Sequence, residues 1–142
     1  MILVDTVVLS EPMKSRGDPK VATWLDRQAP QTLYVSTITV AEILFGVAAL
    51  PPGRRRQGLA EGFEAVLATS FAGRVLAFDI AAARAYATLR AAARAKGFAI
   101  TPLDAQIAAI TLSRGFAVAT RDEGPFRSAG VEVVNPWTEG AE

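Results

Sequence analysis

The sequence contains neither cysteine nor histidine in its 142 residues. The absence of cysteine excludes a disulfide framework and a thiolate zinc site. The absence of histidine excludes a Ser-His-Asp triad, a Cys-His pair and imidazole-bound zinc or copper. Any bound metal must therefore use oxygen ligands, which favours Mg²⁺ or Mn²⁺ over Ca²⁺.

The chain also has little net charge and no long apolar run. Its formal net charge is +1, which argues against a protein held to nucleic acid by bulk charge alone. No segment reaches the ~20 apolar residues of a membrane span. The N-terminal apolar run is broken by Asp5 and lacks the basic residues of a signal peptide. We expect a cytoplasmic protein with one folded domain over residues 1–137 and a flexible tail over 138–142.

Strand-like and helix-like segments alternate along the chain. Asp18-Pro19 and Thr101-Pro102 are typical helix starts. The alternation predicts an α/β fold with a mainly parallel sheet. The strands are expected at 2–5, 33–36, 74–78, 116–120 and 131–136, and the helices at 19–28, from about 40, at 54–69 with interruptions at Gly58 and Gly62, at 79–96 and at 102–114.

Four acidic residues fall where this topology brings chain segments together. Asp5 ends the first strand, and Asp122 lies just past the strand at 116–120. Glu42 and Asp104 lie in the expected first turns of two helices that begin at the same edge of the sheet. Because ligands bind at the carboxyl ends of parallel strands, the four carboxylates are expected on one rim.

Each acid also has a purely structural interpretation. Thr39-x-x-Glu42 reads as a capping box and Thr101-x-x-Asp104 as its near relative, while the other two acids fit turns. Taken together the acids favour a cation, since like charges ~4 Å apart repel by about 1–4 kcal/mol per pair. A hard divalent ion at such a rim can activate water and polarise a phosphoryl oxygen, with a carboxylate orienting the water.

Several segments, in this order and spacing, resemble the PIN-domain ribonucleases, specifically the VapC-type toxins of bacterial toxin–antitoxin pairs and their FitB-like branch. The resemblance runs from residue 1 to about Trp137. The matching segments are "ILVDT" with "LSEP", "TVAEILFGV", "TPLDAQIAA", "VATRDEGPF" and "VEVVNPW".

The resemblance implies a PIN-like three-layer α/β/α sandwich and a metal-dependent endoribonuclease that hydrolyses RNA with a metal-activated water. It implies that Asp5, Glu42, Asp104 and Asp122 are both the catalytic and the metal-binding residues, for Mg²⁺ or Mn²⁺. It also implies a homodimer, a cognate antitoxin and a higher toxin–antitoxin assembly. DNA is expected to be bound only through the antitoxin.

One departure from the family pattern keeps a second hypothesis open. Family members usually carry Asn or Ser two residues after the first acid, and this chain carries Val7. The loss of a polar residue beside a metal site costs about 10–100-fold in affinity or activity. The alternative is therefore a catalytically weakened PIN-fold protein that binds its antitoxin and itself without cutting.

Neighbouring polar residues have weaker assignments. Thr6, Thr120 and Arg121 lie beside the acids and are candidates for substrate contact or for support of the metal ligands. For Arg121, pairing with a phosphate and pairing with the carboxylates stay equally open. Arg90 and Arg94 share a helix face, for which solvation is favoured over an RNA groove.

Overall fold

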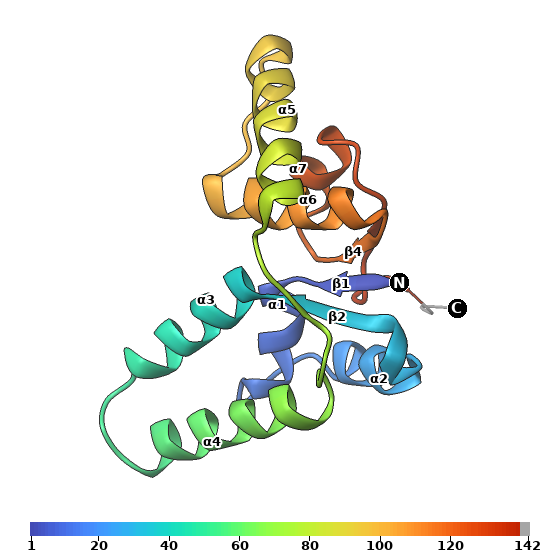
Figure 1. Cartoon of the computed structure of the whole chain (residues 1–142). Helices are drawn as coiled ribbons and strands as arrows, with labels where there is room; N and C mark the ends of the chain where they lie inside the picture. The colour runs from blue at the N-terminus through green and yellow to red at the C-terminus, as the bar shows by residue number, and fades with distance from the viewer. Residues whose placement is uncertain (140–142) are drawn as a thin grey trace.

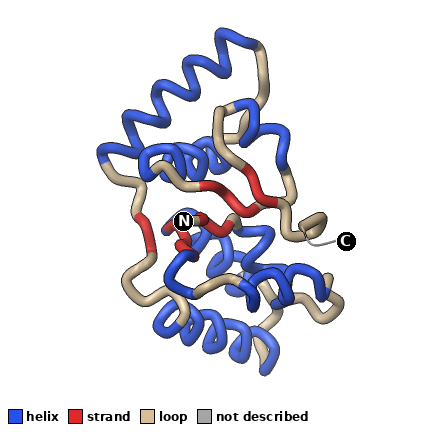
Figure 2. The backbone as a smooth tube through the Cα atoms, turned by 90° about the vertical axis from the view of Figure 1, so that its right-hand side faces the viewer, coloured by secondary structure: helices blue, strands red, loops and turns tan. Residues whose placement is uncertain are grey.

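A five-stranded parallel sheet forms the centre of the computed structural model, which describes residues 1–139 (Figures 1 and 2). The strand order is β3-β2-β1-β4-β5, and all four pairings are parallel. The carboxyl ends of the strands therefore lie at one edge, and the predicted α/β class is confirmed. The strands are β1 (Ile2–Val4), β2 (Leu33–Ser36), β3 (Val75–Leu76), β4 (Ala117–Ala119) and β5 (Val133–Val134).

Helices cover both faces of the sheet, which gives the three layers that the family resemblance implied. Figure 1 shows α5, α6 and α7 on one side of the strands and α1, α2 and α4 on the other. The helices are α1 (Thr6–Ser10), α2 (Pro19–Arg27), α3 (Thr37–Ala48), α4 (Arg54–Thr69), α5 (Ile80–Lys96), α6 (Pro102–Arg114) and α7 (Glu123–Ser128), with short 3₁₀ turns η1 (Glu11–Met13) and η2 (Pro30–Thr32).

The two-residue period of the strands divides the core into two clusters. Leu3 and Val118 point to the side of α5, α6 and α7, where Phe126 is fully buried. Val4 and Ala119, one residue further along each strand, pack with α1, α2, α3 and α4. Successive side chains of β1 and β4 therefore serve opposite faces, as expected for a sheet covered on both sides.

Two predicted helix starts are confirmed in atomic detail. The Asp18 carboxylate accepts a hydrogen bond from the backbone N–H of Lys20 at 2.9 Å, and α2 follows with Pro19 in its first turn. Thr101 caps α6 in the same way. The predicted interruptions of the helix at 54–69 are wrong, because α4 runs unbroken through Gly58 and Gly62.

The start of α3 also differs from the prediction. The helix begins at Thr37 rather than near residue 40, because the Ser36 hydroxyl accepts a hydrogen bond from the Thr39 N–H at 3.1 Å. Ser36 is therefore the cap, and the capping box predicted for Thr39 and Glu42 is wrong. Four of the strands are shorter than the predicted 2–5, 74–78, 116–120 and 131–136.

Two short helices, α1 and α7, were not predicted. The sequence of α1, "TVVLS", is rich in β-branched residues, which locally favour extended backbone. Tertiary contacts decide the outcome, because Asp5 caps the helix while Val8 and Leu9 enter the core.

A turn follows β5. The backbone N–H groups of Thr138 and Glu139 donate to the Asn135 carbonyl at 3.1 and 2.9 Å. Residues 140–142 of the predicted tail lie outside the described residues. Over residues 1–139, no helix is long and apolar enough to cross a membrane.

Gly17 generates a stability prediction. A Cβ at this position would overlap the backbone carbonyl oxygen of Glu11, which cannot move aside as a side chain can, whereas a Cβ at Gly58 would meet open space. We expect Gly17→Ala to lower the free energy of unfolding by about 1–3 kcal/mol. Gly58→Ala, inside α4, should raise it by about 0.5–1 kcal/mol. Urea unfolding of both variants checks this, and equal effects would contradict the close packing at Gly17.

Candidate active site

Asp5 is a buried carboxylate at the end of the central strand. Its residue surface is 5% exposed, yet both carboxylate oxygens have partners. Oδ1 accepts the backbone N–H of Thr6 at 2.8 Å, and Oδ2 accepts the Thr120 hydroxyl at 2.8 Å. The first bond caps α1, and the second joins β1 to the end of β4. Local capping therefore explains only one of the two oxygens.

The position of Asp5 in the sheet is the one that binds ligands in open parallel folds. From β1 the chain continues to β2 and β3 on one side, and β4 and β5 lie on the other. The crossovers therefore diverge between β1 and β4, and the carboxyl ends of two such strands are where open parallel sheets bind ligands. The Asp5 N–H donates to the Ala119 carbonyl at 2.9 Å at this point.

Glu42 is linked to Asp5 through Thr6, whose hydroxyl donates to Glu42 and whose backbone N–H donates to Asp5. It lies in the second turn of α3, not the first turn as predicted, because α3 starts earlier. Its Oε1 accepts the Thr6 hydroxyl at 2.7 Å, and the Thr6 and Thr39 hydroxyls lie 3.0 Å apart. Because a hydroxyl has one hydrogen, Thr39 donates to Thr6 while Thr6 donates to Glu42. The resulting chain of hydrogen bonds fixes α3 against α1.

Asp104 and Asp122 complete the acidic set from the other side of β1. Asp104 is half-buried in the first turn of α6, where its N–H donates to the Thr101 hydroxyl at 3.2 Å. Asp122 is exposed, and its N–H donates to the Thr120 hydroxyl at 3.2 Å. The side chain of Asp122 makes no capping bond to α7.

Glu123, which follows Asp122, is engaged elsewhere. Its Oε1 accepts from Arg127 Nη2 at 2.7 Å and its Oε2 from Asn135 Nδ2 at 2.9 Å. These bonds lower the pKa of Glu123, the Asn135 bond most. Asp122 is therefore the acid at the end of β4 whose carboxylate is free of such partners within residues 1–139.

The electrostatics connect the four acids predicted from the sequence. Burial, together with the smaller effect of the charges of Asp104 and Glu42, raises the pKa of Asp5 to about 6, against the hydrogen bonds from Thr120 and Thr6 that lower it. Burial also raises the pKa of Asp104, and the charges of Asp122 and Glu42 add to this effect. The fold has thus concentrated negative charge at one rim.

A divalent cation fits the donor chemistry of this rim. Every side-chain donor is a carboxylate or hydroxyl oxygen, which suits Mg²⁺ or Mn²⁺. Within the described part of the chain, no three acidic side chains are grouped closely enough to ligate one ion together. Mg²⁺ usually keeps several waters and binds through one or two carboxylates plus a substrate phosphate, so the arrangement suits that mode.

Arg121 and Trp137 form a pair beside the acids. The Arg121 guanidinium carbon lies 5.0 Å from the centre of the Trp137 ring. Arg121 is exposed, and no ion pair with a carboxylate is formed by it within residues 1–139. Sequence reasoning missed the roles of Trp137 and Thr39. The spacing of Thr39 and Glu42 in the sequence indicates only a capping box, and not the contact of the Thr39 hydroxyl with Thr6.

An apolar cavity lies away from the acids. It has a volume of about 510 Å³ and lies among η1, α2 and α4. None of the four acids lines it. Its apolar walls include Leu9, Leu25, Leu59, Phe63, Val66 and Phe71.

The buried Asp5 predicts a pH dependence of stability in the metal-free protein. The folded state holds the Asp5 proton up to about pH 6, whereas the unfolded chain releases it near the ordinary value of 3.8. Between these values the folded state binds more protons, so the free energy of unfolding falls as pH rises. Above pH 6, Asp5 should have lowered the free energy of unfolding by ~3 kcal/mol in total. The raised pKa of Asp104 lowers it further as pH rises.

Urea unfolding from pH 4 to 7 in EDTA measures this dependence. Asp5→Asn should flatten most of the slope and raise stability at pH 7, while Asp26→Asn, an exposed substitution on α2, should keep the wild-type slope. Identical slopes for wild type and Asp5→Asn would contradict the burial cost.

Comparison with known proteins identifies the family to which this fold belongs. A family model described as "PIN domain" matches residues 2–132. "Plasmid stability protein StbB" from Pseudomonas syringae pv. tomato is 53% identical over 137 residues, which cover 96% of this chain and 99% of that protein. "VapC ribonuclease Y4jK" from Sinorhizobium fredii is 47% identical over 137 residues, with 96% and 98% coverage.

A third relative also has a structural counterpart. "Toxin FitB" from Neisseria gonorrhoeae is 43% identical over 137 residues, with 96% and 99% coverage. A chain in the crystal structure of FitAcB from Neisseria gonorrhoeae matches with a TM-score of 0.93 and 43% identity, covering 97% of this chain and 99% of that one. The family resemblance is thereby confirmed: the chain belongs to the PIN-domain family.

Proposed function

We propose that this chain is a Mg²⁺- or Mn²⁺-dependent endoribonuclease that acts as the toxin of a type II toxin–antitoxin pair. The observation that carries the proposal is Asp5, a buried carboxylate where the crossovers diverge between β1 and β4, whose pKa is raised by burial and also by the charges of Asp104 and Glu42. A fold gains no stability from this repulsion, so the arrangement is explained by a cationic ligand. Relatives named a VapC ribonuclease and a toxin support RNA as the substrate.

The residues of the site have distinct roles in this proposal. Asp5 and Asp104 are the principal ligands, because burial and neighbouring carboxylates raise the pKa values of both. Each Asp5 oxygen accepts one hydrogen bond, and a carboxylate oxygen has two acceptor sites, so capacity for a cation remains. A bound divalent ion would supply charge stabilisation at the phosphate and lower the pKa of a water.

The remaining acids, Glu42 and Asp122, are proposed to act on the water and the substrate. Glu42 uses Oε1 for Thr6, which leaves Oε2 to orient water or a hydrated ion. The exposed Asp122 is held by its N–H bond to Thr120, the same hydroxyl that donates to Asp5. Thr120 therefore sets the positions of two acids at once.

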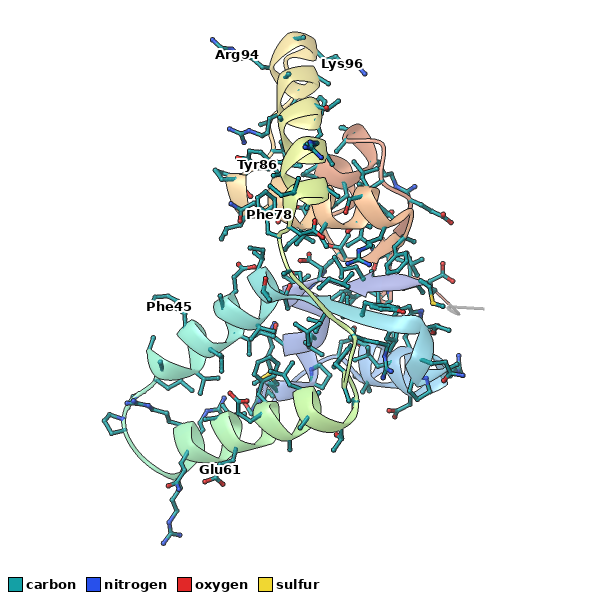
Figure 3. All side chains as sticks on the ribbon, in the orientation of Figure 1. Phe45, Glu61, Phe78, Tyr86, Arg94 and Lys96 are labelled. Atoms are coloured by element: carbon teal, nitrogen blue, oxygen red, sulfur yellow. The ribbon has the colours of Figure 1, made fainter. Side chains whose placement is uncertain are left out.

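The proposal includes a cognate antitoxin and a homodimer as partners, with DNA contacted only through the antitoxin. Exposed apolar side chains on α3 and at the start of α5 support association with another protein. Phe45 is 76% exposed and Ile80 is 66% exposed, and Figure 3 shows Phe45 projecting from α3.

Cleavage of RNA by the purified chain tests the activity. With Mn²⁺ or Mg²⁺ we expect cutting that EDTA abolishes and that Asp5→Asn or Asp104→Asn lowers by at least about 100-fold, equivalent to about 2.7 kcal/mol of transition-state stabilisation. Asp26→Asn is the charge-matched control and should cut normally. A metal-dependent rise in melting temperature, lost in Asp104→Asn, gives a readout besides activity. Undiminished cutting in EDTA would contradict the proposal.

Val7 distinguishes the toxin from a weakened interaction protein. Its side chain is 43% exposed on α1, directly after Thr6, so a polar replacement costs little core packing. If the missing polar group limits activity, Val7→Asn should raise the cleavage rate by about 10–100-fold. Val66→Asn, at a similarly exposed valine of α4, should leave the rate unchanged. An inactive wild type whose Val7→Asn variant cuts RNA would favour the weakened interaction protein.

A further inference from the structure

A basic pocket lies on α5 and the loop that follows it. Between Asp79 and Asp104 the chain carries four cations and no carboxylate. Arg90 and Arg94 lie one turn apart and line a pocket of about 600 Å³ together with Phe98 and Thr101. A pocket of this size is large enough for one nucleotide.

The pocket walls are held in place before any ligand arrives. Arg90 donates from Nη1 to the Ile100 carbonyl at 2.9 Å, and its guanidinium carbon lies 5.7 Å from the centre of the Tyr86 ring. These contacts fix a long, flexible side chain at the pocket wall. Arg94 is exposed, and Phe98 is half-buried against the core. The pocket therefore combines the oriented guanidinium of Arg90 and the exposed guanidinium of Arg94 with an aromatic side chain.

The pocket adjoins the acidic rim. Thr101 lines the pocket, and its hydroxyl accepts the N–H of Asp104 at 3.2 Å. A polyanion approaching the four acids is repelled by them, and the overall charge of +1 offers little compensation. The cations of α5 supply the local attraction that the acidic rim lacks.

We propose that this pocket binds one nucleotide of a single-stranded RNA substrate, next to the phosphodiester at the acidic rim. Arg94 and Arg90 contact its phosphate, and Phe98 stacks on its base. The inference rests on the proposed function for its choice of RNA as the ligand. It replaces the solvated surface that the sequence favoured for these two arginines.

Two charge-neutralising variants of one helix turn test the phosphate contact. Arg94 and Lys96 both lie in the last turn of α5, and Figure 3 shows them projecting to opposite sides of the helix. Lys96 does not line the pocket. Arg94→Gln and Lys96→Gln therefore remove the same charge from the same turn, with only the first inside the pocket.

The readout is the anisotropy of a labelled single-stranded RNA oligonucleotide, titrated with the full chain in EDTA at several salt concentrations. Arg94→Gln should weaken binding about five- to tenfold and reduce the slope of log K against log[salt] by about 0.7, the value for one lost phosphate contact on a single strand. Lys96→Gln should match the wild type. Phe98→Leu should weaken binding by at least about fivefold with an unchanged slope, because stacking carries no charge.

Three results would overturn the inference. The first is no measurable binding by the wild type, and the second is an equal loss for Arg94→Gln and Lys96→Gln, which indicates diffuse attraction only. The third is a change in the native mass of Arg94→Gln with unaltered RNA affinity, which assigns the pocket to a protein interface. Metal-dependent cleavage by the wild type alongside any of these preserves the proposed function. If the RNA binds as expected but is not cleaved with any metal, the proposal for the pocket stands and the proposed nuclease activity is contradicted.

Discussion

The Asp5 carboxylate is the point on which the site depends. It is buried where the crossovers of the sheet diverge, and its two oxygens accept hydrogen bonds from Thr6 and Thr120. One bond starts α1 and the other joins the carboxyl ends of β1 and β4. Removing a charged group from water costs several kcal/mol unless it is well paired. The rest of the fold must therefore offset the free energy of burying Asp5, and this burial occurs where the substrate chemistry is proposed.

Three threonines turn this carboxylate into an organised site. Thr6 and Thr39 connect α1 to Glu42 on α3, and Thr120 connects Asp5 to the backbone of Asp122. Hydroxyls suit this task because one group can donate and accept at once. They orient negative side chains without adding positive charge, which would compete with a metal ion. In the proposed complex with RNA, the attraction for the phosphates comes instead from the cations of α5.

Much of the layout was accessible from sequence because it depends on local signals and on topology. Alternating strands and helices predicted a parallel sheet, and parallel strands bring their carboxyl ends to one edge. Asp5, Asp104 and Asp122 could be placed at that edge from their neighbours alone. The predicted start of α3, the helix that carries Glu42, lies too far along the chain. Ser36 and Thr39 are equally good N-caps by residue type. Only the packing of α3 shows which hydroxyl accepts the N–H.

The sequence by itself determined the oxygen-only donor chemistry, the α/β class and the acids that meet at one rim. Those properties follow from the residue types and the order of the segments. The tertiary structure alone decided how the acids are held. Thr120, whose hydroxyl donates to Asp5, is 115 residues away along the chain, and Thr6, whose hydroxyl donates to Glu42, is 36 residues away. It also decided that "TVVLS" is a helix, because burial of Val8 and Leu9 outweighs the small local preference of β-branched residues for strands.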